Sequence, residues 1–166
     1  YLQVSRGADT GRDHGFPSGL PPTVFAMASP VAATPLANAG VRAITGPDIR
    51  WARRDIKSTA LLANVLLRQA ATEAGAGEYL MLHDGYVTEG SGSSVLIVEG
   101  KVVVTRPNSH DILPGTTIRM VRDVAVSCGF GYREENVSES RLRGADEVWI
   151  SAALRGVAPV THIDGR

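Results

Sequence analysis

Residues 48–58 read DIRWARRDIKS, and residues 59–74 continue as TALLANVLLRQAATEA. Lys57 stands directly before this apolar run and follows a charged cluster of Asp48, Arg50, Arg53, Arg54 and Asp55. Neighbouring cations and burial both favour the neutral form of a lysine amine. A neutral lysine amine is a nucleophile that forms a Schiff base with a carbonyl compound. The same residues are also typical of a solvated charge cluster at a helix start, because ion-pair networks occur away from catalytic sites as well.

The run after Lys57 has helical periodicity. Apolar and long side chains recur three and four residues apart, which predicts a helix over residues 59–74. They are Leu61, Leu62, Val65, Leu66 and Gln69. Gly75 and Gly77 follow and are expected to end this helix.

Segments typical of strands flank this helix on both sides. We expect strands over residues 1–6, 23–31, 41–45, 78–84, 132–137, 146–154 and 157–166, and a hairpin over 94–106 that turns at residues 99–100. Residues 85–93, GYVTEGSGS, are expected to form a Gly/Ser-rich turn. Two more helices are expected at 116–129 and at 138–145, the second with Ser138 as its N-cap. Strands outnumber helices, which indicates an α/β (α+β) fold with helices over one or two mixed sheets.

The chain is expected to contain parts of two domains. Residues 31–40 form a connector of small residues with one proline, so we place a boundary near residues 30–38. The first 33 residues are then the tail of an earlier domain whose beginning is absent, and residues 34–166 form the larger domain. The chain begins at Tyr1 and ends within a predicted strand and turn, so we expect a piece of a longer protein.

Composition excludes several functional classes. The 17 basic and 17 acidic residues cancel, which argues against a general binder of nucleic acids or acidic membranes. No apolar run approaches the roughly 20 residues of a membrane span. Cys128 is the single cysteine, so no disulfide forms within the chain, and a reducing cytoplasmic setting is expected.

Glu89, in the segment TEGSGSS, is a second candidate for chemistry. A carboxylate between a strand and a Gly-rich turn can pair with a protonated ring nitrogen. Such a bond tunes pyridoxal phosphate (PLP) as an electron sink. An exposed carboxylate in a turn is an equally good interpretation of this residue alone.

Residues 115–117, GTT, precede a predicted helix. Free N–H groups and the positive end of the helix dipole suit a phosphate there. Gly115 permits close approach, and the hydroxyls of Thr116 and Thr117 add donors. An ordinary helix cap explains the same residues.

Arg12 and His14 are a candidate clamp for a carboxylate, since arginine binds carboxylates in a bidentate manner and histidine adds a hydrogen bond. A solvated loop is the alternative. The other histidines are scattered without ligand spacing, so we predict no metal site. Nucleophile-elbow, Walker and dinucleotide-binding motifs are also absent from the sequence.

In this order, the segments resemble the class IV PLP-dependent aminotransferases, the family of D-amino-acid aminotransferase, branched-chain aminotransferase and aminodeoxychorismate lyase. The resemblance is carried by residues 6–17, RGADTGRDHGFP; 48–71, DIRWARRDIKSTALLANVLLRQAA; 88–94, TEGSGSS; 112–121, ILPGTTIRMV; and 157–165, VAPVTHIDG. It implies fold type IV, in which a small N-terminal α/β domain and a larger domain of barrel-like mixed sheets hold PLP between them. Most of the small domain is missing here.

The resemblance implies a role for each candidate. Lys57 is expected to form the Schiff base with PLP and to move the proton, and Glu89 to bond the pyridine nitrogen. The residues expected to hold the rest of the cofactor are Gly115, Thr116, Thr117 and Ala153. Arg12 and His14, reaching across a homodimer, and Leu154 and Arg155 are expected to bind the substrate. The arginine–histidine pair favours the D-amino-acid branch.

Four residues at three places depart from the family pattern. Ala153 stands where a threonine usually donates to the phosphate. Gly92 and Ser94 replace a serine and an asparagine, and Gly156 replaces an acid.

Three functions follow. The first is transfer of an amino group from a D-amino acid, or a related amino acid, to a 2-oxo acid. The second is another activity on the same scaffold, either a lyase of the aminodeoxychorismate type or a branched-chain aminotransferase. The third is a non-catalytic homologue that acts as a binding protein.

Overall fold

The computed structural model describes residues 1–31 and 39–166. The chain divides into two compact units, Tyr1–Ala33 and Thr34–Arg166. The domain boundary expected near residues 30–38 falls mostly outside the described residues. Within the described ranges, every helix is too short or too polar to cross a membrane.

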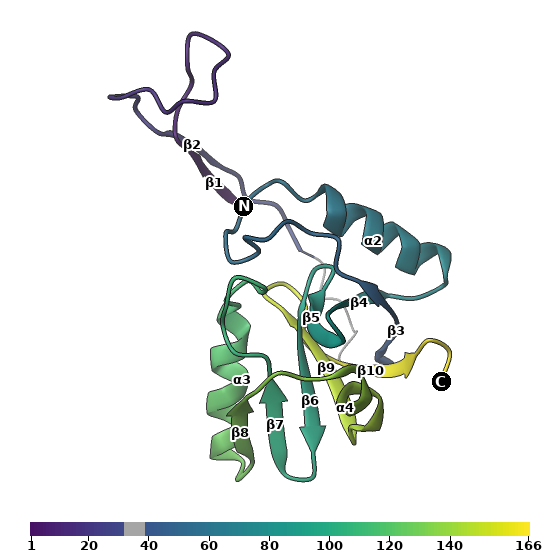
Figure 1. Cartoon of the computed structure of the whole chain (residues 1–166). Helices are drawn as coiled ribbons and strands as arrows, with labels where there is room; N and C mark the ends of the chain where they lie inside the picture. Colours follow the sequence, from purple (N-terminus) through teal and green to yellow (C-terminus); the bar gives the residue numbers. More distant parts are fainter. Residues whose placement is uncertain (32–38) are drawn as a thin grey trace. The chain divides into compact units, whose positions relative to one another are not determined.

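The first unit is a two-stranded antiparallel hairpin with a long connecting loop (Figure 1). Strands β1 (Leu2–Ser5) and β2 (Thr23–Ala26) form it. Within the loop, the Arg6 guanidinium lies 4.2 Å from the centre of the Phe16 ring, a cation–π contact. Both strands expected in this region are confirmed, although β2 is shorter than predicted.

The second unit is built on one mixed sheet of eight strands in the order β5-β4-β3-β10-β9-β6-β7-β8 (Figure 1). The strands are β3 (Val41–Pro47), β4 (Glu78–His83), β5 (Tyr86–Gly90), β6 (Ser94–Glu99), β7 (Val102–Thr105), β8 (Gly131–Glu134), β9 (Glu147–Ala152) and β10 (Gly156–Ile163). The pairs β4–β3, β3–β10 and β7–β8 are parallel, and the other pairs are antiparallel. The sheet curls, so that β5 also contacts β6.

Side-chain alternation along the strands divides the core into layers. In β6, Val95 and Ile97 belong to the cluster inside the curl, whereas Leu96 and Val98 belong to a second cluster on the other face. Helix α3 (Thr116–Ser127) covers that second cluster with Val121. The two-residue period of a strand therefore explains why the whole run 95–98 is apolar.

Helix α2 (Leu62–Glu73) covers β4 in the same way. Leu67 and Ala71 of the helix pack on Tyr79 and Met81, while Leu80 points into the curl. The helix predicted over residues 59–74 is confirmed, but it begins three residues later. Leu61 at its N-cap makes no side-chain cap bond.

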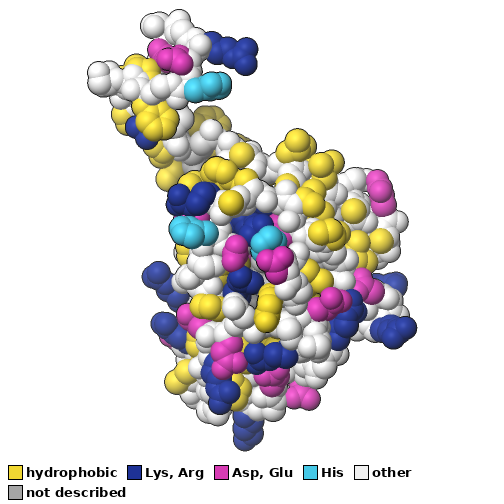
Figure 2. All heavy atoms as spheres, viewed as in Figure 1, with side chains coloured by type: hydrophobic (Ala, Val, Ile, Leu, Met, Phe, Trp, Pro, Cys, Tyr) yellow, Lys and Arg dark blue, Asp and Glu magenta, His cyan; other side chains and the backbone are white. Residues whose placement is uncertain are grey.

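The apolar residues that predicted α2 are not the ones that it buries. The side chains that recur at helical spacing are 50% to 73% exposed in this unit: Leu61, Leu62, Val65 and Leu66. The helix therefore presents a second apolar face, which we call the α2 face and define by these four residues. Figure 2 shows hydrophobic side chains gathered over the helix.

Two other helix predictions are confirmed. Helix α3 begins at Thr116 as expected, and Gly129 follows it with a positive φ of 81°. Helix α4 (Glu139–Gly144) has Ser138 as its N-cap, whose hydroxyl accepts a hydrogen bond from the Arg141 N–H at 3.3 Å.

The prediction of a turn over residues 85–93 is wrong in its first half. Residues Tyr86–Gly90 form strand β5, which pairs with β4. Its aromatic and β-branched residues at 86–88 favour a strand, and the apolar interior of the curl provides the partner. Glu89 is therefore a strand residue rather than a turn residue.

Candidate active site

Asp48 is the most deeply buried acid of the segment that contains Lys57, with none of its side chain exposed. The Arg50 side chain donates to it twice, from Nε to Oδ1 at 3.0 Å and from Nη2 to Oδ2 at 2.7 Å, and the Arg50 N–H donates to Oδ1 at 3.0 Å. The Thr88 hydroxyl donates to Oδ2 at 2.7 Å. Burial raises the pKa of Asp48, but the bonds from Arg50 and Thr88 outweigh burial and hold the pKa below its ordinary value.

The same arginine holds Glu89. Arg50 Nη1 lies 2.5 Å from Glu89 Oε2, and both side chains are buried. For Glu89, burial raises the pKa by more than the bond from Arg50 lowers it, so the pKa lies above its ordinary value. Of the two carboxylates that Arg50 binds, Glu89 is thus the one closer to accepting a proton.

A third acid joins the segment to the loop before α3. Asp111 accepts from Arg54 Nη1 at 2.8 Å and from Arg106 Nη2 at 2.6 Å. In addition, the Arg54 N–H donates to the carbonyl of His110 at 2.9 Å. Residues 50–54 are therefore fixed against residues 110–111, although the two segments are far apart in the sequence.

Lys57 is exposed. The arginines expected to act on it are matched by acids: Arg50 and Arg54 by Asp48, and Arg53 by Asp55 at 2.9 Å. These acids therefore neutralise much of the positive charge that the arginines bring near Lys57. Within the described residues Lys57 itself makes no salt bridge, which leaves its amine available for chemistry.

The N-terminus of α3 is open to a ligand. Gly115 is the N-cap residue and supplies no side-chain cap bond, so the first N–H groups of the helix lack that acceptor. A Cβ at Gly115 would lie 2.9 Å from Ser94 Oγ, closer than carbon and oxygen tolerate without movement. Glycine is therefore needed for the helix start to approach β6. Thr116 is exposed, and Thr117 is half-buried.

The turn between β9 and β10 lies at the same end of the strands as the start of α3. Ser151 pairs with Ser94 across β9 and β6, and its buried hydroxyl has no hydrogen-bond partner among the described residues. The turn residues Ala153, Leu154 and Arg155 follow, and all three are exposed. Ser94 is thus next to both the start of α3 and the strand that leads into this turn.

The structure brings together many of the residues singled out in the sequence. Glu89, the start of α3 and the β9–β10 turn lie at the same end of the strands. Arg50 connects the segment that contains Lys57 to this end by its bond to Glu89. Arg12 and His14 lie in the loop of the first unit, and both are exposed. Among the described residues there is no group of three or more histidines, cysteines or acids that could hold a metal ion.

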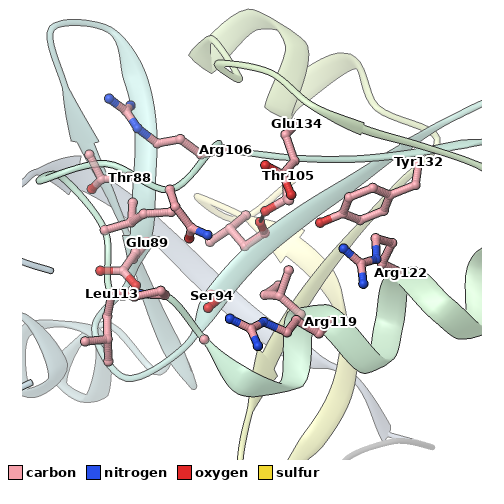
Figure 3. A pocket seen from close by; sticks show the side chains of 16 residues that line it. Thr88, Glu89, Ser94, Thr105, Arg106, Leu113, Arg119, Arg122, Tyr132 and Glu134 are labelled. Carbon is pink, nitrogen blue, oxygen red and sulfur yellow. Dashed lines mark hydrogen bonds between the residues drawn. The ribbon is translucent and has the colours of Figure 1, made fainter.

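A cavity of about 400 Å³ lies behind Glu89, between α3, β7 and β8. Thr88 and Glu89 line one end, and side chains of α3 and β8 line the other, including Arg119, Arg122 and Tyr132 (Figure 3). Burial raises the pKa of the Tyr132 hydroxyl, and the nearby Glu134 raises it further. The lining also includes Ser94 and Gly115, so the cavity reaches the start of α3.

Sequence reasoning missed several charged residues of the site. Arg106, Asp111 and Glu78 are all held by side-chain bonds around the segment that contains Lys57 or the turn after Glu89. Arg106 and Asp111 stand in a polar loop, and Glu78 stands at the start of a strand, where charged residues are common. No local pattern distinguishes them from solvated side chains.

Comparison with known proteins adds independent observations. The family model of the class IV amino-transferases matches residues 1–163. The D-alanine aminotransferases of Bacillus licheniformis and Staphylococcus epidermidis are 42% and 38% identical to this chain over 100% and 99% of its length. The chain spans 59% of the length of each of these relatives.

Solved structures agree with the fold. A hypothetical aminotransferase from Mycobacterium tuberculosis, in its PLP-bound form, has a TM-score of 0.82 and 30% identity, covering 99% of this chain and 60% of that one. The branched-chain amino acid aminotransferase of Escherichia coli has a TM-score of 0.79 and 27% identity, covering 95% of this chain and 55% of that one. The expected fold, a mixed curled sheet with helices over it, is therefore confirmed.

Proposed function

Because this chain belongs to the class IV aminotransferase family, we propose that its whole protein transfers an amino group from a D-amino acid to a 2-oxo acid with PLP as cofactor. The D-alanine aminotransferases among its relatives support the D-amino-acid branch. We propose a cytoplasmic location, as expected of a chain in which Cys128 is an exposed free thiol.

One observation carries the proposal. The buried Glu89 is held by Arg50 at the end of the strands where α3 begins, and α3 begins without a side-chain cap. A carboxylate fixed in this way can bond a protonated ring nitrogen. An uncapped helix start behind a glycine suits a phosphate. These two groups match the two ends of PLP, so the chain's own residues fit the cofactor.

Each site residue has a proposed task. When bound, PLP withdraws electrons from the α-carbon of an amino acid, which makes its α-proton removable. Lys57 supplies the amine that attaches the cofactor and then moves this proton, since it is exposed and makes no salt bridge within the described residues. Glu89 keeps the ring nitrogen protonated. Gly115, Thr116 and Thr117 hold the phosphate, and Ala153 contributes only backbone.

Four residues are proposed to bind the substrate. Arg12 and His14 would clamp the α-carboxylate of the substrate, and the exposed turn residues Leu154 and Arg155 would line the pocket. The clamp is proposed to act across a homodimer. The α2 face supports this, because an exposed apolar patch on a helix marks an interface.

The hypothesis of a branched-chain aminotransferase is favoured by one observation, the structural likeness to the E. coli branched-chain enzyme. Its lower identity, 27% against 42% for the B. licheniformis relative, makes it the second candidate.

The test uses the full-length protein and its Lys57→Ala variant, with Lys101→Ala as the control, since Lys101 is an exposed residue beside the β6–β7 turn. Amino transfer to 2-oxoglutarate is measured from D-alanine and from L-leucine, and pyruvate release is measured from aminodeoxychorismate. We expect transfer from D-alanine and a visible cofactor band that borohydride abolishes, with both lost only in Lys57→Ala. Preference for L-leucine would favour the second candidate, pyruvate release from aminodeoxychorismate a lyase, and no cofactor band a binding protein.

A further inference from the structure

Glu78, the first residue of β4, has a carboxylate that is only 1% exposed. Its Oε1 accepts hydrogen bonds from the N–H of Tyr79 at 2.9 Å, from the N–H of Ser91 at 3.0 Å and from the Ser91 hydroxyl. Its Oε2 accepts from the Ser93 hydroxyl at 2.8 Å. A buried carboxylate is costly unless its oxygens are bonded, and here both oxygens are. Three of the four donors belong to the turn that follows Glu89.

This turn, residues 90–93, is folded around the carboxylate. The Gly90 N–H donates to the Ser93 carbonyl at 2.7 Å, which closes the turn. A Cβ at Gly90 would lie 2.2 Å from Ser93 Oγ and 3.0 Å from the carboxyl carbon of Glu78. Only glycine fits there, because any side chain would displace the groups that bind Glu78. Gly92, by contrast, has no atom within 4 Å of such a Cβ.

Helix α2 holds the other side of the same turn. Asn64 Nδ2 donates to the Ser91 carbonyl at 2.9 Å. Arg68 Nη1 donates to the Gly77 carbonyl and lies 3.6 Å from Glu78 Oε1. The turn is thus bonded both to β4 and to α2, and α2 is the helix that follows Lys57.

We propose that Glu78 is a positioning residue whose buried carboxylate fixes the 90–93 turn against α2 and so sets the place of Glu89 relative to Lys57. This rests on the proposed function, in which those two residues bind opposite parts of one rigid cofactor. Glu89 is adjacent to Gly90, so a shift of the turn moves its backbone directly. A small error in such a placement lowers the rate of a reaction that depends on orientation.

The chemistry of the turn explains why a carboxylate is needed rather than an amide. Tyr79, Ser91 and Ser93 all present donors to Glu78. A glutamine can turn its oxygen toward Tyr79 and Ser91, but its NH₂ group then faces Ser93. The Ser93 hydroxyl must then accept instead of donate, and the bonds that remain from Tyr79 and Ser91 go to a neutral acceptor.

The test uses full-length protein with the substitutions Ser93→Ala and Glu78→Gln. Ser93→Ala removes a single hydroxyl and is expected to leave the fold intact. Ser93→Thr restores a hydroxyl, and Ser127→Ala is the control, because Ser127 bonds only the Val124 carbonyl near the end of α3. Hydrogen exchange of the amides of residues 90–93 is measured without PLP. PLP affinity, kcat, KM and the pH profile of kcat are measured with it.

We expect exchange at residues 90–93 to rise about fivefold or more in Ser93→Ala and Glu78→Gln. We expect kcat to fall with little change in the KM of the amino acid, and the acidic limb of the pH profile to shift, since Glu89 is displaced. Ser93→Thr should restore both, and Ser127→Ala should change neither. Unchanged hydrogen exchange at residues 90–93 would overturn the proposal that Glu78 fixes this turn. Faster exchange with an unchanged kcat and pH profile would overturn the positioning role of Glu78. A wild-type protein that binds no PLP would instead contradict the proposed function on which this role rests.

Discussion

Arg50 Nη1 donates to Glu89 Oε2 at 2.5 Å, and Arg50 Nε and Nη2 donate to Asp48. One guanidinium therefore binds two buried carboxylates. The pKa of Asp48 lies below its ordinary value and that of Glu89 above it. For Glu89, burial is the largest effect and raises the pKa, whereas for Asp48 the bonds from Arg50 and Thr88 together outweigh burial. One arginine thus binds two buried acids whose pKa values are displaced in opposite directions.

Arg50→Lys is expected to move the acidic limb of the pH profile of kcat to higher pH. Lysine keeps the positive charge but loses the planar fork that reaches both acids. Burial then raises the pKa of Glu89 further, and the protonated acid can no longer bond a ring N–H. Arg53→Lys, which alters only the exposed pair with Asp55, should leave the profile unchanged. An unshifted limb in Arg50→Lys would contradict the link between Arg50 and Glu89.

Asp48→Asn is expected to lower the free energy of unfolding at neutral pH by on the order of 3 kcal/mol, because buried arginines lose their partner. The pKa of Asp48 is depressed, so its contribution is present above its ordinary value of 3.8 and is lost as pH falls through the lower folded-state pKa. The gap between wild type and variant is the difference in their free energies of unfolding, measured with urea from pH 3 to pH 7. This gap should therefore narrow at the acidic end. Asp123→Asn, in the exposed pair with Arg122, is the control and should change little at any pH. A gap for Asp48→Asn that is independent of pH would contradict this account.

Ala153→Thr is expected to tighten PLP binding about tenfold, by adding a hydroxyl donor to the phosphate. Ala153→Val has nearly the same shape without the hydroxyl and is the matched control. Dissociation constants from cofactor titration of the full-length apoprotein give the measurement. Equal gains in both variants would indicate packing rather than a phosphate contact.

Val65→Asp is expected to dissociate the proposed homodimer without unfolding it, because Val65 is 60% exposed in this unit and a charge there disfavours burial in an interface. Analytical ultracentrifugation over a range of protein concentrations measures the change. Val124→Asp, at a valine of α3 that is 56% exposed, is the matched control and should keep the wild-type mass. A dimer of unchanged strength in Val65→Asp would place the interface elsewhere.

Arg12→Ala is expected to raise the KM of the amino acid at least tenfold, with PLP content unchanged, because a charge-assisted bidentate bond to the carboxylate is lost. Arg12→Lys should recover only part of the loss, since it keeps the charge but not the fork. Arg6→Lys, which changes the cation over Phe16, is the control within the same loop. A KM that is unchanged in Arg12→Ala would remove this residue from the substrate site.

Periodicity and caps predicted most of the elements from the sequence alone. Helices α2, α3 and α4, the hairpin of β6 and β7, and the N-cap Ser138 follow from local patterns that tertiary contacts did not override. The turn expected over 85–93 failed in its first half because its Gly and Ser residues outweighed the strand-forming residues 86–88. The pairing that decides between them is made with β4.

The buried charges could not be predicted in the same way. Glu78 looks like any polar residue at a strand end, and its burial depends on a turn twelve residues later. Likewise, an apolar stripe such as the α2 face has the same pattern whether it meets the core or a partner. Local sequence gives the residue types of the site, whereas their pairing depends on contacts distant in the chain.

The central place of β10 in the sheet has a consequence for how the chain folds. This strand alone joins β3 to β9, so without it the sheet would separate into β5-β4-β3 and β9-β6-β7-β8. Its parallel partner β3 was synthesised more than a hundred residues earlier, as the pairing of Val160 with Val41 shows. Closing so long a loop is slow, and both half-sheets expose an open edge until it happens. A nascent chain on the ribosome must therefore wait for residues 156–163 to emerge, and that interval is when it is most exposed to aggregation and most in need of a chaperone.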